Sequence, residues 1–293
     1  MNTPVAEESK SNAQQVLAEA FKKAWDSYRK EIRNCRDEFS NEAVHDLRVA
    51  TRRMLAMIKL LNSMQPRPRF DKIIREFKDQ LDELDDLRDT QVILAEISEV
   101  RNELPQLHPF QEQLQADEAK MLRSLRKKIK KFETSDLEKR IDKTQASLED
   151  DQTEDLESKI LQAVDDEYQL ADERLAWVDA TRSTTIHRVR VAFKSLRYMI
   201  EIIYPLLQDY PEQNLKRMND YQSLMGEIQD SEVFMQTLAD YSETASFPDM
   251  EPVRRYYEQR HNEAISAYIQ DMNQLNTFWR PAPDQSFPWE KHK

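Results

Sequence analysis

The chain contains one glycine, Gly226, among its 293 residues. Tight hairpin turns, dinucleotide-binding folds and phosphate-binding loops need backbone conformations that glycine adopts readily and other residues do not. Such scarcity argues against β structure, Rossmann folds and P-loops. The remaining composition is rich in Leu, Glu, Lys, Arg, Ala and Gln, which favour helices. We therefore predict an all-α fold.

The composition also limits the class of protein. Hydrophobic residues make up 39% and charged residues 33% of the chain, which is polar but not typical of disorder. Cys35 is the only cysteine, so we expect no disulfide within the chain and no thiolate zinc site. The N-terminus lacks the apolar core of a signal peptide, and no apolar run is long enough to span a membrane. These features predict a cytoplasmic protein.

Apolar periodicity, prolines and capping residues divide the chain into helical stretches. We expect a flexible leader over 1–12 and an irregular tail over 279–293. Between them we expect a first helical bundle at 13–133, an acidic linker or helix end at 134–158, and a second bundle at 159–278. The expected helices are 13–38, 42–64, 70–102, 109–133, 157–180, 185–208, 212–244 and 249–276, with Ser40 and Asn41 as capping residues of the second.

Two distant segments of the chain resemble each other. VHDLRVATRRMLAMIKLL, which starts at residue 44, aligns with IHRVRVAFKSLRYMIEII, which starts at residue 186. Further along, LDDLRDTQVI at 84–93 aligns with MGEIQDSEVF at 225–234. A repeat of this length is not a short solenoid unit. It predicts two helical bundles of about four helices each, related by internal duplication.

The two histidine-headed helices each have an apolar face and a cationic stripe, as a projection at about 100° per residue shows. The first apolar face holds Leu47, Ala50, Met54, Met57, Ile58 and Leu61, and the second holds Val189, Ala192, Leu196, Met199, Ile200 and Ile203. The first stripe carries His45, Arg48, Arg52 and Lys59, with Arg53 beside it, and the second carries His187, Arg190, Lys194 and Arg197. We expect both stripes to face away from their bundles.

A solvated helix face normally alternates signs, because like charges four residues apart repel each other. Here the stripes carry one sign in a chain whose formal net charge is −12. A third segment, KMLRSLRKKIKK at 120–131, adds seven basic residues and no acid, among them Arg123, Arg126, Lys127 and Lys130. We expect these segments to form one basic surface or pore between the bundles, although an ordinary solvated face remains the alternative.

These residues resemble the CHAD domain, the conserved-histidine α-helical domain. The resemblance is carried by VHDLRVATRR at 44–53, IHRVRVAFKSLRY at 186–198 and the LRD and GEIQD segments, and it covers about residues 13–278. It implies an all-helical protein of two four-helix bundles that binds inorganic polyphosphate through a basic surface or pore. It implies this role for His45, Arg48, Arg52, Arg53, His187, Arg190, Lys194 and Arg197.

The chain departs from the family pattern in two places. Ser195 stands where many relatives have a second lysine, and Leu55 stands where the repeat has Arg197, so the halves should contribute unequally. Many relatives carry an adjoining CYTH triphosphate-hydrolase domain, but no alternating ExExK strand motif appears here. We therefore expect a non-enzymatic protein without a cofactor, which binds polyphosphate in the cytoplasm or on polyphosphate granules.

Other functions remain open. His45 and His187 could ligate a metal, although their neighbours at helical spacing are cations. A metal-dependent phosphohydrolase could use the repeated acids Asp85, Asp86, Asp89, Glu227 and Asp230, which we instead expect to pair with arginines such as Arg48 or Arg190. The stripes could also dock an acidic protein partner. Nucleic acid is a less suitable ligand, because only Tyr198 interleaves an aromatic ring with the basic residues. The oligomeric state stays open.

Overall fold

The computed structural model describes residues 4–130, 132, 134–149, 155–244 and 249–292. Within these residues the chain forms helices and no strand, as predicted from the scarcity of glycine. No helix of the described chain is long and apolar enough to cross a membrane. The α-helices are α1 (Pro4–Asp37), α2 (Asn41–Met64), α3 (Pro68–Val100), α4 (His108–Lys130), α5 (Ser135–Glu149), α6 (Leu156–Ala176), α7 (Ser183–Ile203), α8 (Glu212–Thr244) and α9 (Glu251–Asp271).

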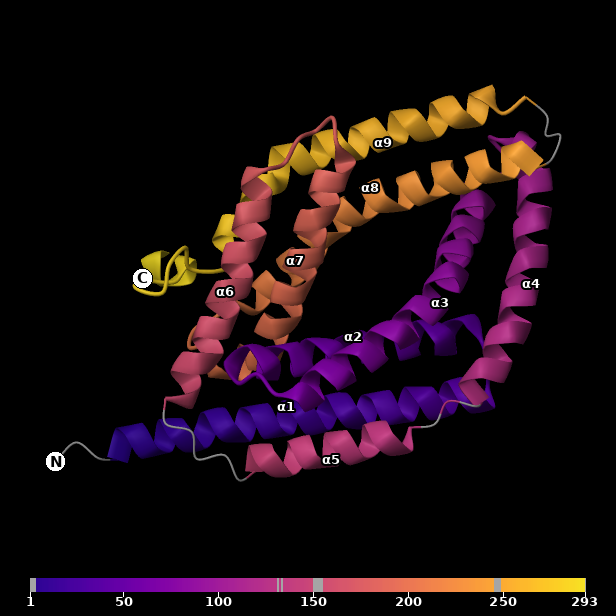
Figure 1. Ribbon diagram of the computed structural model, residues 1–293. Helices are drawn as coiled ribbons and strands as arrows, with labels where there is room; N and C mark the ends of the chain where they lie inside the picture. The colour runs from indigo at the N-terminus through magenta and orange to yellow at the C-terminus, as the bar shows by residue number, and fades with distance from the viewer. Residues whose placement is uncertain (1–3, 131, 133, 150–154, 245–248, 293) are drawn as a thin grey trace.

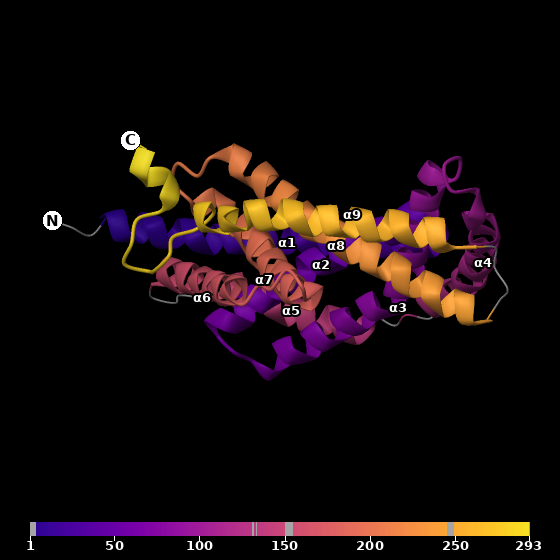
Figure 2. The ribbon, with the colours of Figure 1, turned by 90° about the horizontal axis from the view of Figure 1, so that it is seen from above.

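The helices pack largely in antiparallel pairs that form the sides of a quadrilateral (Figure 1). One side consists of α1 and α2, with α5 against the outside of α1, and the next consists of α6 and α7. The long helices α8 and α9 form the third side and α3 and α4 the fourth. Seen from above, α9 runs along α8, and α4 lies at the end of the molecule away from both termini (Figure 2).

The two expected halves of the chain share their hydrophobic core. The larger cluster joins buried residues of α1, α2 and α5 to residues of α6, α7 and α8, including Met57, Leu137 and Ile200. A second cluster joins the distal ends of α3 and α4 to those of α8 and α9, with Phe234 stacked on Tyr257. Each cluster therefore contains residues from both halves. The internal duplication itself remains a prediction.

The apolar faces expected of the two histidine-headed helices are confirmed. Every residue assigned to the apolar faces of α2 and α7 is buried. Ser40 caps α2, since its hydroxyl accepts a hydrogen bond from the Ala43 N–H at 3.1 Å. The 3.6-residue period therefore sets which side of α2 and α7 is buried, and thereby which side carries the basic residues.

The helix boundaries differ from the prediction at the N-terminus. Residues 1–3 lie outside the described residues, but α1 already begins at Pro4, within the expected flexible leader. Proline is well tolerated in the first turn of a helix, where its missing N–H has no partner to lose. The polar residues that follow include Ala, Glu, Lys and Gln, which are helix formers, so polarity alone was a poor indicator of a flexible segment.

The segment expected to be an acidic linker or helix end, 134–158, contains a helix. Its first part forms α5, which packs on α1 through the buried residues Leu137 and Ile141. These two residues lie four apart, so they share one face of a helix even though acids and lysines surround them. Much of the acidic run, residues 150–154, lies outside the described residues.

The C-terminal tail contains a short 3₁₀ helix, Pro288–His292, and part of it belongs to the core. Trp279 is fully buried, and its indole N–H donates to the Asp165 carboxylate of α6 at 2.7 Å. The Arg280 guanidinium donates to both oxygens of the same carboxylate, at 2.9 and 2.6 Å. Phe287 stacks on Trp289 nearby. These contacts hold the tail against α6.

Gly226 lies within the continuous helix α8, and no close helix contact explains it. A Cβ atom at this position would meet only Nη2 of Arg190, at 4.0 Å, which is ordinary van der Waals contact. Glycine within a helix costs about 1 kcal/mol relative to alanine. The absent side chain leaves space beside the Arg190 guanidinium instead.

We expect Gly226→Ala to raise the free energy of unfolding by about 0.5–1 kcal/mol, because alanine removes the entropic cost of glycine without a steric clash. Urea unfolding followed by circular dichroism measures the difference. A destabilised variant would show that α8 requires glycine for a reason of packing.

Candidate anion-binding site

The cationic stripes of α2 and α7 meet where these two helices pack on each other. Burial, followed by the charge of Arg48, lowers the pKa of Arg52 on α2, and the charge of Arg190 on α7 makes a smaller contribution. Lys194 of α7 is in turn influenced by both Arg52 and Arg190. We call Arg52, Arg190 and Lys194 the cation cluster. The side chains of all three are partly buried.

The cation cluster has no acidic partner within ion-pair distance. Among the residues that the structure describes, no hydrogen bond or ion pair involves the side chain of Arg52, Arg190 or Lys194. Nε of Arg190 is buried without any hydrogen-bond acceptor. Removing charge from water without a partner is costly, so the folded protein retains an unfavourable arrangement here. An anion bound at this position would relieve it.

The pKa of Lys194 shows the effect of burial and of the surrounding positive charges. Burial and the charges of Arg52, Arg190, Arg48 and Arg197 lower the pKa of its ammonium from 10.5 to about 7. Burial disfavours the charged form, and each neighbouring cation adds repulsion. At neutral pH the amine is therefore about half protonated, whereas the guanidinium groups stay charged.

Arg48, which was expected to lie on an outward-facing stripe, is instead 4% exposed. Its guanidinium forms an ion pair with Asp85 of α3 and also donates to the Leu81 carbonyl. The pairing of Arg48 with one of the repeated acids is thus as predicted. The ion pair joins α2 to α3, so Arg48 supports the site rather than offering a free charge to a ligand.

The charge of Arg197 is also balanced by a carboxylate. Its guanidinium donates to Glu201 at 2.6 Å and to Gln222 of α8 at 3.0 Å, and it lies over the ring of Tyr198. Lys59 departs from the first stripe in a different way, because it lies near Glu167 of α6, whose charge opposes the lowering of its pKa by burial. Neither residue extends the cation cluster.

The histidines of the two helices are exposed. Although His45 is mostly exposed, partial shielding of its ring from water lowers its pKa below the usual value, and the charge of Arg88 lowers it further. Both effects favour neutral imidazole at pH 7. Arg88 lies on α3 and was not among the residues predicted for the site. Its position in the LRD segment was the only sequence signal for it. Burial raises the pKa of Asp230 on α8, and the charge of Arg88, after that of Arg190, opposes this rise.

The basic segment on α4 lies apart from α7. Arg123, Arg126, Lys127 and Lys130 are exposed on α4, which packs on α3 and α1. Lys128 of the same segment forms an ion pair with Glu83 of α3. Lys131 lies outside the described residues. A continuous basic surface from α4 to the cation cluster therefore remains a prediction.

The repeated acids approach one another between α3 and α8. Asp89 and Asp230 each have a raised pKa, mainly because of burial, and the negative charge of Asp230 contributes to the shift of Asp89. Asp230 and Glu227 line a cavity of about 240 Å³ with Arg88 and Arg260. In the described part of the chain, no group of three or more histidine, cysteine or acidic residues is arranged to hold a metal ion.

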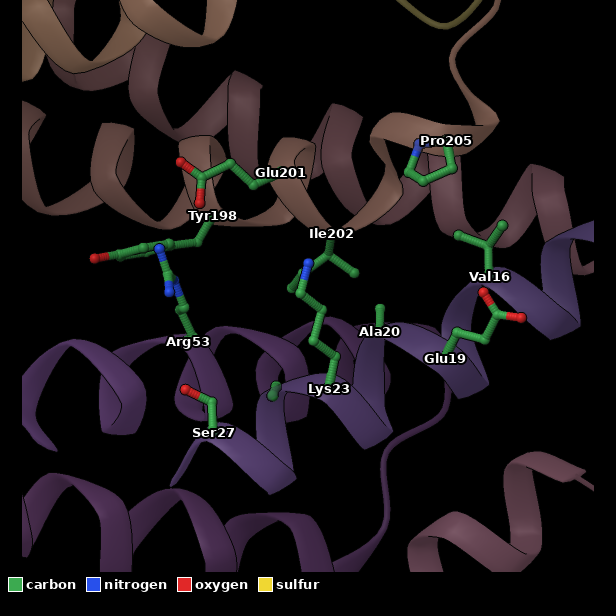
Figure 3. A pocket seen from close by; sticks show the side chains of 11 residues that line it. Val16, Glu19, Ala20, Lys23, Ser27, Arg53, Tyr198, Glu201, Ile202 and Pro205 are labelled. Atoms are coloured by element: carbon green, nitrogen blue, oxygen red, sulfur yellow. The ribbon is translucent and has the colours of Figure 1, made fainter. Parts of the chain in front are cut away.

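Arg53 lines a groove between α1 and α7. This groove has a volume of about 470 Å³, and its lining includes Val16, Lys23, Tyr198 and Ile202. In Figure 3 the guanidinium of Arg53 lies next to the ring of Tyr198, while Lys23 extends toward Ile202. None of the three residues of the cation cluster lines this groove.

The arrangement of helices matches a known family. A family model described as the CHAD domain matches residues 16–239. The chain belongs to the CHAD family. The crystal structure of the CHAD domain from the plant Ricinus communis is similar over 90% of this chain and 89% of that chain, with a TM-score of 0.65 and 15% sequence identity. This likeness shows the CHAD fold. A search of curated proteins found no match for the chain.

Two arginines one turn apart on the first histidine helix of this CHAD domain should affect stability differently. Arg48→Gln should lower the free energy of unfolding by about 1–3 kcal/mol, because it breaks the ion pair with the half-exposed Asp85. Arg52→Gln removes a cation that has no partner, so it should be neutral or stabilising by up to about 1 kcal/mol. Urea unfolding of both variants tests the contrast, which equal losses would contradict.

Lys194→Met should stabilise the protein by about 1–3 kcal/mol at pH 6, because an apolar side chain replaces a partly buried, unpaired charge. The folded-state pKa of about 7 lies below the ordinary 10.5, so the cost of Lys194 is complete below pH 7 and decreases between pH 7 and 10.5. The difference between variant and wild type should therefore shrink at pH 9.5. Unfolding measured at both pH values tests this, and a difference independent of pH would contradict it.

Proposed function

We propose that this CHAD chain binds inorganic polyphosphate at the cation cluster and does not catalyse a reaction on it. The observation that supports the proposal most strongly is the partly buried group of Arg52, Arg190 and Lys194, which has no acidic partner within ion-pair distance. Folding leaves these charges uncompensated, although the chain has 55 acidic residues that could have neutralised them. A polyanion would supply the missing negative charge.

The chemistry of the cluster suits linear polyphosphate. Guanidinium groups form forked hydrogen bonds to phosphate oxygens, and the Lys194 ammonium adds a point charge. His45 and Arg88 lie close by and could contact the neighbouring phosphates of an extended chain. The formal net charge of −12 repels polyanions at long range, so binding must depend on this local concentration of positive charge. Family membership adds support through the role that CHAD resemblance implies.

The cysteine content of the chain allows us to propose the compartment in which the protein acts. Cys35 is buried, and burial raises the pKa of its thiol to about 11, so it is an unreactive core residue. The sequence offers no second cysteine for a disulfide. Such a chain is suited to a reducing compartment. We therefore propose that it meets polyphosphate in the cytoplasm, in solution or on granules.

Isothermal titration calorimetry with a long polyphosphate, at several salt concentrations, tests the proposed function. We expect tight binding at low salt that weakens as salt rises, since each neutralised phosphate of a single strand contributes about 0.7 to the logarithmic slope. The double variant Arg52→Gln/Arg190→Gln should bind at least about tenfold more weakly, with a slope smaller by about 1.4. Because Arg48 is paired with Asp85, the test leaves that residue intact.

The matched control is Lys216→Gln/Arg255→Gln, which removes two exposed charges that are paired on α8 and α9. This control should bind like wild type. Absence of binding at low salt, or equal losses in both double variants, would overturn the proposed site. Adding magnesium and assaying for free phosphate separates binding from phosphohydrolysis, and single-stranded DNA tests selectivity. An acidic protein partner would be displaced by polyphosphate if it used the same residues.

A further inference from the structure

The groove between α1 and α7, which Arg53 lines, has the size and position of a small-molecule site. Its volume of about 470 Å³ lies within the range of about 300–1,000 Å³ that is usual for ligand pockets. It lies where a helix of the first half of the chain faces a helix of the second half, and such junctions often hold ligands. The lining residues of α1 run from Val16 to Ser27, so this wall is about 16 Å long.

Much of the groove is lined by small or aliphatic side chains. They are Val16, Ala20, Ala24, Ile202 and Pro205. In Figure 3, Val16 and Pro205 lie at the end of the groove away from Arg53. The ring of Tyr198 is already in contact with cations, because Arg53 lies next to it and Cζ of Arg197 lies over it, 4.6 Å from its centroid. The apolar surface left for a ligand is therefore mainly aliphatic.

Two cations of the groove are available to a ligand. Among the residues that the structure describes, none forms a hydrogen bond or an ion pair with the side chain of Arg53 or Lys23. The acid nearest to them in Figure 3, Glu201, is paired with Arg197 at 2.6 Å. The other acid, Glu19, lies at the end away from Arg53 (Figure 3). A negative group is therefore favoured at one end of the groove and an uncharged group along the rest.

The charges of the groove also limit how many negative charges the ligand carries. The lining contains two cations and two acids, so it offers no excess of positive charge to a polyanion. A carboxylate carries a single negative charge, and a guanidinium group binds it through two parallel hydrogen bonds. An aliphatic chain attached to the carboxylate would be removed from water by the apolar lining, which is favourable.

We propose that this groove binds one aliphatic carboxylate of medium chain length. The carboxylate lies at Arg53 and Lys23, and the chain extends past Ala20 and Ile202 toward Pro205. The CHAD resemblance implies a polyphosphate role for Arg53, whereas this proposal gives it a different ligand at a site separate from the cation cluster. The ligand contacts both halves of the chain, because α1 and α7 both line the groove.

Isothermal titration calorimetry of the full chain with octanoate, below the concentration at which octanoate forms micelles, tests the proposal. We expect one octanoate to bind per chain. Octan-1-ol has the same chain without the charge, so it should bind at least about tenfold more weakly, since it loses the hydrogen bonds between charged groups. Octylamine has the opposite charge and should bind more weakly than octanoate. Acetate, which has the charge without the chain, should show no measurable binding.

Two variants test the two parts of the site separately. Arg53→Gln should weaken octanoate binding at least about tenfold, because it removes the charged donor. Its matched control is Arg75→Gln, which removes an exposed arginine of α3 outside the groove and should bind octanoate like wild type. Ala20→Leu fills part of the groove without changing its charge, so it should weaken the binding of octanoate and of octan-1-ol alike.

Absence of octanoate binding, equal affinities for octanoate and octan-1-ol, or equal affinities of the Arg53 and Arg75 variants would overturn the proposal. Displacement of octanoate by polyphosphate would also overturn it, because the groove would then belong to the polyphosphate site. The Arg52→Gln/Arg190→Gln variant should bind octanoate like wild type, so failure of the proposed function can be distinguished from failure of this site. The comparison of ligands uses wild-type protein and does not depend on whether a variant folds.

Discussion

The approach of α2 to α7 is the constraint on which the site depends, because it brings like charges together. The buried faces of the two helices, from Met57 on one and Ile200 on the other, pack into one apolar cluster. Burial of each such side chain stabilises the fold by about 1.5–3 kcal/mol, and the repulsion among Arg52, Arg190 and Lys194 opposes part of this gain. The apolar contact thus holds the charges in place without neutralising them.

The charges of the two halves are balanced unequally. In the first half Arg48 is paired with Asp85, while Arg190, at the equivalent place in the second half, has no acid within ion-pair distance. Asp230 lies near enough to Arg190 to respond to its charge, but it also responds to Arg88 and Arg260. The pairing of Arg48 makes the charges of the two stripes unequal, and the unequal contribution to the site expected from Leu55 and Arg197 remains a prediction. In the first stripe Arg48 joins α2 to α3 through Asp85, and Arg52 belongs to the cation cluster. The second stripe provides the other two members of the cluster, Arg190 and Lys194.

Periodicity was sufficient to predict the helices other than α5 and the buried faces of α2 and α7, because such a face depends only on residue spacing along one helix. It was not sufficient for the side chains of the stripes. Whether Arg48 is free depends on how closely Asp85 of α3 approaches, and the pKa of Lys59 responds to the charge of Glu167, on a helix far away in sequence. Arg88 was missed for the same reason. The helix α5 was missed because only a few apolar residues, Leu137 and Ile141 among them, stand among many charged ones. These two residues are buried in the structure, where α5 packs on α1.

The shared core has a consequence for how the molecule loses its structure. Since the larger cluster contains residues from α1 through α8, neither half can separate from the other without exposing apolar surface to water. We therefore expect the chain to behave as one cooperative unit despite the resemblance between its halves. An anion held between α2 and α7 would then link the two halves of the chain, because α2 belongs to the first half and α7 to the second. Its binding free energy would raise the resistance of the whole chain to heat and proteolysis.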